Sequence, residues 1–506
     1  MLRAFKPRAE RAAHRAPGAG SSVPGSLTAV GNVVFFTADD GVHGTELWKT
    51  DGTPAGTTLV QDINLGPDGS EPSDMAAFGG KVLFAATGPF GRELYESDGT
   101  SAQLVGDINT LSGDSFPSSL TTVGGLVLFI ADDGAAGSEL WKYDGTAASI
   151  VKDINPSSGS MFSRLTAVGG TVYFVADDGT SGADLWKSDG TLAGTLMVKD
   201  IALGSGNSFP ANLAAVGSTL FFTARDAANG EELWRSGGTP DGTFLVKDIR
   251  PGPDGSFAED LTAVGGTLFF RAFDGVNGFE LWKSDGTPGG TVLVKDIVPG
   301  PDSGSPFQLT EFGGALFFVG QGLNGSELWR SDGTEAGTVV VKEIGPGTLD
   351  AEVDSLTVVD GTLFFNAIDV AAGNELWATL GTEASTVLVA DVRPGPGGSF
   401  AFFLTPVGDT PFFVADDGAS GFELWRTTPF ASPIPKLDVA LNQTSFGPGD
   451  TMLLTVTLAP GLVGPVLADA FIVLDPGDGT VLSLRPDGTL SPGLLPIATG
   501  FVPVPF

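Results

Sequence analysis

The chain has 506 residues with no cysteine, and its formal net charge of −34 comes from 60 acidic and 26 basic residues. The absence of cysteine excludes disulfides and thiol catalysis, and the two histidines, His14 and His43, argue against histidine-based catalysis and multi-histidine metal sites. The acidic balance argues against a nucleic-acid partner, because phosphate binding needs clustered Lys and Arg.

The first 24 residues are interpreted as a flexible, basic leader. They lack the apolar stretch of a signal peptide, since RAPGAGSSVPG follows the basic residues, so either there is no signal or the true start lies upstream. No apolar run reaches the roughly 18 residues that a transmembrane helix needs, so no transmembrane segment is predicted.

A nine-fold repeat organises most of the chain. Its ELW-type cores begin at residues 46, 93, 139, 184, 232, 280, 327, 375 and 423, so successive steps are 45–48 residues long. A regular step of this length is typical of repeat architectures.

Each repeat predicts four strands, which in the first unit cover residues 27–31, 33–39, 45–51 and 57–63. Glycine-rich pairs between the first two strands suit type I′ hairpin turns. The second strand is apolar on both faces, as in VVFF at 33–36, which indicates a strand buried between packed sheets. The sequence therefore predicts an all-β fold, a β-propeller of four-stranded blades, over residues 25–435. A β-solenoid is the alternative, although its rungs are usually shorter and lack hairpin turns.

The strand count favours nine blades, the last lacking a clear fourth strand. The segment KLDVAL at 436–441 is the candidate to complete it, and a closed ring of eight with a displaced unit is the alternative. Residues 436–506 alternate like an antiparallel sandwich but are shorter than the roughly 100 residues of an Ig-like domain. They are interpreted as a truncated Ig-like module.

The motifs ELWKTDGT (46–53), ELWKSDGT (280–287) and ELWRSDGT (327–334) resemble the ELWxxDGT repeat proteins of bacteria. The resemblance covers about residues 27–427. It implies a secreted or surface-exposed protein of propeller-like repeats, accompanied by Ig-like modules, and it implies no catalytic activity.

The motif residues are predicted to be structural. The acidic residue is expected to accept N–H groups of a neighbouring loop, or to pair with the Lys or Arg three positions on. The aromatic residue is expected to pack against the next blade, with a sugar-stacking rim as the alternative. The Asp of DGT is expected to start a turn by bonding the backbone two residues on. Representative sets are Glu46, Trp48 and Asp51; Glu139, Trp141 and Asp144; Glu280, Trp282 and Asp285; and Glu327, Trp329 and Asp332.

Paired aspartates in the loops between the second and third strands form a candidate calcium site, because clustered carboxylates beside a Gly turn suit Ca²⁺. The unit-seven loop carries Gln321-Gly322 instead, and most loops offer few ligands. The competing interpretation is a solvated acidic loop. The candidate ligands are Asp39, Asp40, Asp132, Asp133, Asp177, Asp178, Asp416 and Asp417.

No catalytic or cofactor-binding residue is predicted. The sequence favours a monomeric, non-enzymatic scaffold or adhesin outside the cell or at its surface, which binds an unidentified protein or glycan. The alternative is a carboxylate-dependent hydrolase or lyase acting on polysaccharides. Such an enzyme should interrupt the repeat at one or two loops with a unique charged cluster, and the sequence shows none.

Overall fold

The computed structural model describes residues 9–12, 21–110, 113–160, 165–322, 325–345 and 350–427, together with short strands between 437 and 492. The chain divides into two compact units, residues 1–430 and 431–506. In the described part of the chain, no helix is long and apolar enough to cross a membrane.

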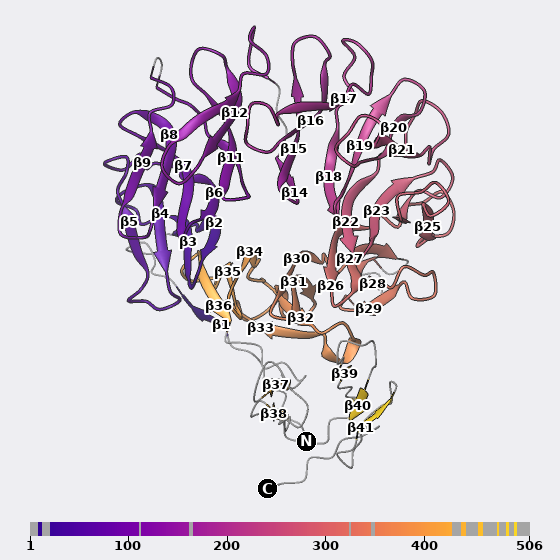
Figure 1. Cartoon of the computed structure of the whole chain (residues 1–506). Coiled ribbons are helices and arrows are strands. Elements are labelled where there is room, and N and C mark those ends of the chain that lie inside the picture. The colour runs from indigo at the N-terminus through magenta and orange to yellow at the C-terminus, as the bar shows by residue number, and fades with distance from the viewer. Residues whose placement is uncertain are drawn as a thin grey trace. The chain divides into compact units, whose positions relative to one another are not determined.

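The first unit is a nine-bladed β-propeller of four-stranded antiparallel sheets (Figure 1). The first blade consists of β2 (Gly25–Val30), β3 (Val33–Asp39), β4 (Thr45–Thr50) and β5 (Thr58–Gln61). We call these positions A, B, C and D, from the axis of the ring outward. The predicted fold class and blade number are therefore confirmed.

The other A strands are β6 (Ser73–Phe78), β10 (Ser118–Val123), β14 (Thr166–Val168), β18 (Ala211–Val216), β22 (Glu259–Val264), β26 (Phe307–Phe312), β30 (Asp354–Val359) and β34 (Phe402–Val407). The B strands are β7 (Lys81–Gly88), β11 (Leu126–Asp132), β15 (Thr171–Asp177), β19 (Thr219–Asp226), β23 (Thr267–Phe273), β27 (Ala315–Gly322), β31 (Thr362–Asp369) and β35 (Thr410–Asp416). The C strands are β8 (Gly91–Ser97), β12 (Ser138–Tyr143), β16 (Ala183–Ser188), β20 (Gly230–Ser236), β24 (Phe279–Ser284), β28 (Gly325–Ser331), β32 (Gly373–Thr379) and β36 (Phe422–Thr427). The D strands are β9 (Ala102–Gly106), β13 (Ala148–Lys152), β17 (Leu196–Lys199), β21 (Thr243–Lys247), β25 (Val292–Lys295), β29 (Val339–Lys342) and β33 (Val387–Ala390), which a 3₁₀ turn, η1 (Glu383–Ser385), precedes.

The A–B turns have the predicted geometry. Gly79 and Gly80 have φ of 59° and 80°, and Asp360 and Gly361 have φ of 42° and 69°. Two successive residues with positive φ define a type I′ turn, whose twist matches that of a two-stranded hairpin.

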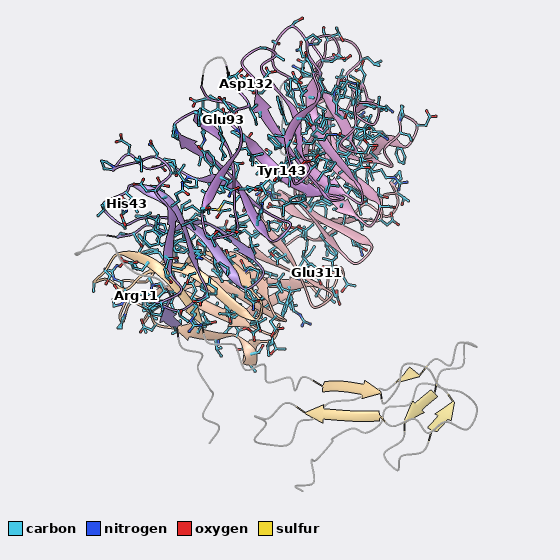
Figure 2. All side chains as sticks on the ribbon, turned by 60° about the vertical axis from the view of Figure 1, so that its left-hand side comes forward. Arg11, His43, Glu93, Asp132, Tyr143 and Glu311 are labelled. Atoms are coloured by element: carbon cyan, nitrogen blue, oxygen red, sulfur yellow. The ribbon has the colours of Figure 1, made fainter. Side chains whose placement is uncertain are left out.

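Apolar side chains fill the space between neighbouring blades (Figure 2). One core cluster joins Phe221 and Leu233 of the fifth blade to Leu268, Phe270 and Trp282 of the sixth. The B strands are buried because each lies in the middle of a sheet that is covered on both faces.

The ring closes through the N-terminal segment. The strand β1 (Ala9–Arg11) pairs antiparallel with β36 and supplies the D strand of the ninth blade. The Arg11 guanidinium lies 5.5 Å from the centroid of the Trp425 ring and pairs with Asp417. The buried Ala12 joins the core between the ninth and first blades.

Two expectations are corrected by this closure. The segment at 436–441 does not complete the ninth blade, because β37 (Leu437–Leu441) pairs with β38 (Leu454–Leu458) in the second unit. The leader predicted at residues 1–24 contributes a strand to the propeller. The second unit also contains β39 (Val473–Leu474), β40 (Leu482–Leu484) and β41 (Leu490–Pro492) in one sheet. The rest of the predicted Ig-like module lies outside the described residues.

Candidate functional site

The antiparallel order of each blade separates its connections onto two faces. The B–C loops and the D–A linkers lie at one end of the strands, which we call the linker face. The A–B and C–D turns lie at the other end, which we call the turn face.

One buried residue in each D–A linker joins two blades, and we call it the bridging residue. In the sixth linker it is Ser256, whose N–H donates to the Glu231 carbonyl of the fifth blade and whose carbonyl accepts from Phe273 N–H of the sixth, both at 2.9 Å. The equivalent residues are Ser22, Ser70, Ser115, Ser160, Ser208, Gly304, Ala351 and Ser399.

The acidic residue of the ELW motif holds this linker in place. Glu232 is fully buried and accepts the Ser256 hydroxyl at 2.6 Å and the Arg250 N–H at 3.1 Å. Glu46 binds Ser70 and Asn64 in the same way, and Glu280 accepts N–H groups from Ile297 and Gly304. The predicted acceptance of loop N–H groups is therefore observed.

The alternative pairing with the Lys or Arg three positions on is not formed in these blades. The Lys283 ammonium instead donates to the Gly333 carbonyl in the C–D turn of the next blade, at 2.8 Å. Burial raises the pKa of Glu232, Glu280 and Glu327 to about 7. It raises the pKa of Asp184, the corresponding acid of the fourth blade, to about 6.

The aromatic residue of the motif packs between blades, so a sugar-stacking rim is not available at these positions. Trp282 is 6% exposed and lies in the core cluster shared by the fifth and sixth blades. Tyr95, Trp186, Trp234, Trp329 and Trp377 are also buried, whereas Trp48, Trp141 and Trp425 are half-buried.

The Asp of DGT forms the predicted turn. The Asp285 carboxylate accepts the N–H and the hydroxyl of Thr287 at 2.9 and 2.7 Å. These bonds, with the hydroxyl contributing most, lower the pKa of Asp285. The Thr146 hydroxyl, with N–H donors of the same turn, lowers the pKa of Asp144 to about 2.

The candidate calcium ligands also serve as turn acceptors. Asp39 accepts the Gly41 N–H at 2.7 Å, and Asp40 accepts the N–H groups of Val42 and His43. Figure 2 shows His43 and Asp132 in different blades, apart from each other. Within the described residues, no three His, Cys, Asp or Glu side chains are placed to hold a metal ion. The eight aspartates are thus not brought together as a ligand set.

The repeat is interrupted where the seventh blade meets the eighth. The bridging residue is serine at seven of the nine junctions, and the two exceptions are Gly304 and Ala351, which enter the seventh and eighth blades. The next residue is Phe in four other linkers and Val, Glu or Met in three, and it is Ser305 and Glu352 here. Near the end of β27, the seventh blade also carries Gln321 where four blades have Asp.

A pocket of about 360 Å³ opens at this interruption on the linker face. It lies between the seventh blade and the linker into the eighth, and none of its lining residues is basic. Asn366 donates to Asp354 at 3.0 Å, and the Glu352 N–H donates to Asp350 at 2.9 Å, which orients two of its carboxylates. The lining residues are Ser305, Phe307, Gln321, Ser326, Asp350, Glu352, Val353 and Asp354.

The prediction that no loop interrupts the repeat with a unique charged cluster overlooked the departure in these two linkers. The motif positions from which it was drawn lie in the C strands and C–D turns, which the pocket does not involve. Aligning the residues that precede each A strand would have shown the departure, because Gly304 and Ala351 stand where the other seven junctions have serine.

No family model and no curated protein sequence matches the chain. The resemblance to ELWxxDGT repeat proteins therefore stays a prediction. Among solved structures, a puromycin hydrolase is similar at 16% identity and a TM-score of 0.36, over 68% of this chain and 58% of that one. A structure from a study of two prolyl endopeptidases is similar at 12% identity and a TM-score of 0.39, over 78% and 54%. A puromycin-hydrolyzing peptidase of Mycobacterium tuberculosis has 13% identity and a TM-score of 0.35, over 68% and 58%.

These comparisons contradict the expectation of a non-enzymatic scaffold or adhesin without catalytic activity, because the similar structures are those of a hydrolase and of peptidases. The chain spans little more than half the length of each of them. At these identities and TM-scores the likeness assigns neither an activity nor a substrate to this chain.

Proposed function

We propose that the propeller recognises a positively charged group of a peptide substrate or ligand in the pocket between the seventh and eighth blades. The observation that carries the proposal is the coincidence of the pocket with the interruption of the repeat. A position that serves only the fold has the same task in every blade, so a bridging residue that departs from serine at two adjoining junctions beside a pocket indicates a local task.

The chemistry of the lining suits a cation. Asp350, Glu352 and Asp354 contribute negative charge, and no basic side chain of the lining compensates it. Hydroxyl and amide groups of Ser305, Ser326 and Gln321 can accept the hydrogen bonds of an ammonium or guanidinium group. The ring of Phe307 offers an apolar wall to the methylene chain of Lys or Arg. An overall charge of −34 attracts such a ligand from a distance.

The test is calorimetric titration of the full chain with two short peptides, one containing lysine and the other norleucine at the same place. We expect the lysine peptide to bind more tightly, with an advantage that shrinks as salt is added. The substitutions Asp354→Asn and Glu352→Gln should each weaken it by up to roughly fivefold, the range of a partly exposed ion pair.

The matched control is Glu71→Gln, because Glu71 occupies in the second blade the place that Glu352 occupies in the eighth. It should leave the lysine advantage unchanged. Equal binding of both peptides, or equal losses from Glu352→Gln and Glu71→Gln, contradicts the proposal. Mass spectrometry of the same mixtures records whether the peptide is cleaved and so separates recognition alone from recognition that leads to hydrolysis.

We also propose that the protein acts as a monomer outside the cell or at its surface. Its support is the resemblance of the repeats to secreted and surface-exposed ELWxxDGT proteins. Fractionation of cells that express the gene, with size-exclusion chromatography of the purified chain, tests both statements.

A further inference from the structure

A second feature of the linker face is the residue that follows each bridging residue, which we call the rim position. It has positive φ, between 40° and 51°, wherever the structure describes it, including 46° at Phe116, 43° at Phe209, 51° at Phe257 and 49° at Phe400. The other described rim residues are Val23, Glu71, Ser305 and Glu352.

The backbone at the rim position favours glycine, not phenylalanine. A left-handed conformation brings Cβ of a bulky residue close to the following carbonyl, and glycine avoids that cost. Burial does not compensate, because Phe116, Phe209, Phe257 and Phe400 are 59%, 53%, 41% and 50% exposed. The fold imposes this backbone on every described rim residue, and at four of them it carries a phenylalanine ring that stays exposed.

Exposed apolar side chains are distributed unequally between the two faces. In the described residues, Leu192 is the one large apolar side chain exposed in a turn of the turn face. The linker face exposes the four rim phenylalanines and other loop residues, namely Val23, Val42, Leu65, Phe90, Leu203, Val276 and Val370. The asymmetry marks the linker face as the face that contacts a partner.

The rim phenylalanines lie on both sides of the pocket. The inner strands β22, β26, β30 and β34 are neighbours in that order around the ring. Phe257 precedes β22 and Phe400 precedes β34, whereas Phe307 and Asp354, the first residues of β26 and β30, line the pocket between them. A peptide residue in the pocket would therefore have an exposed ring on either side of it.

We infer that the phenylalanine rim binds apolar side chains of an extended peptide whose cationic residue occupies the pocket, so that the ligand class is a basic, apolar-rich peptide segment. The inference rests on the proposed function. Charge complementarity selects this occupant, because aspartates such as Asp39 and Asp416 end B strands at the same face. A second copy of the chain carries the same net charge of −34 and would be repelled.

The test compares two lysine peptides, flanked by leucine or by glycine, binding to the full chain. We expect the leucine peptide to bind roughly tenfold more tightly, because part of each leucine side chain leaves water. The substitutions Phe257→Gly and Phe400→Gly should each reduce the affinity ratio of the leucine peptide to the glycine peptide roughly threefold. The affinity of the glycine peptide should not change. Phe244→Ala is the matched control, since this exposed ring lies on the outer strand β21, and it should change neither affinity.

A second measurement on the same variants, thermal unfolding, separates a loss of binding from a loss of stability. Glycine relieves the left-handed backbone, so the unfolding midpoints of the Phe257 and Phe400 variants should not fall. A fall would show that the rings are structural and would overturn the inference. An unchanged leucine advantage would also overturn it while leaving the pocket proposal intact. A leucine advantage that depends on the rim but not on lysine would support the rim and refute the pocket. A dimer that the glycine variants convert to monomer would assign the rim to self-association and overturn the peptide inference.

Discussion

The hydroxyl of Ser256 is the most testable part of the bridge between blades. Replacing it with alanine keeps the backbone bonds to Glu231 and Phe273 and deletes one donor to the buried Glu232 carboxylate. Loss of a hydrogen bond to a charged group costs about 1.5–3 kcal/mol, whereas a bond to a neutral group costs about 0.5–1.5 kcal/mol. The change removes no apolar surface, so the lost hydrogen bond should account for the whole effect.

The effect should depend on pH in a defined direction. The pKa of Glu232 is raised to about 7 by burial, and the Ser256 hydroxyl lowers it from a still higher value. Without the hydroxyl, the charged form loses more than the protonated form. The free energy of unfolding should therefore fall by the larger amount at pH 9, where Glu232 is charged, and by the smaller amount at pH 5.

Hydrogen exchange by mass spectrometry over residues 249–257 measures this change locally, since a single blade can open without unfolding of the ring. A cost of about 1.5–3 kcal/mol corresponds to exchange roughly 10- to 150-fold faster. The control Ser138→Ala alters an exposed serine and should change nothing. The reverse substitution, Ala351→Ser, should slow exchange near Glu327, more at pH 9 than at pH 5. If exchange at residues 249–257 of Ser256→Ala matches the wild type at pH 9, the bridge does not work as described.

Three further predictions concern the stability of the whole ring. The thermal midpoint in calorimetry should fall as pH rises from about 4.5 to about 7. In that window the raised pKa values of Glu232, Glu280 and Glu327 make the folded state bind more protons than the unfolded state. A midpoint that rises across this pH range would contradict the prediction. The substitution Arg11→Ala should cost about 1–2 kcal/mol through the lost contacts with Asp417 and Trp425, and faster hydrogen exchange confined to β36 and the ninth blade would report it. The substitution Trp282→Ala should cost about 3–5 kcal/mol in denaturant unfolding, as is usual for a buried large aromatic, and an unmoved midpoint would mean that the ring is not packed between blades.

Features that depend on local chemistry repeated along the chain could be predicted from the amino-acid sequence alone. Paired glycines such as Gly79-Gly80 accept positive φ, and an Asp such as Asp285 bonds the next turn residues, so each feature predicts its own turn. Apolar B strands and a fixed aromatic such as Trp282 predict burial between sheets. Nine repetitions of one pattern predict both the four-stranded blade and the number of blades, because each copy supports the assignment of the others.

Features that depend on segments distant in sequence became apparent only in the folded chain. The strand Ala9–Arg11 has three residues and no periodic pattern, yet it closes the ring because the accumulated rotation of nine blades brings the free edge of β36 to it. The pocket arises in the same way, since Gln321, Ser326 and Asp354 come from three elements and meet where two blades adjoin. A changed residue in one linker forms part of a site only because folding places it beside the changed residue of the next linker.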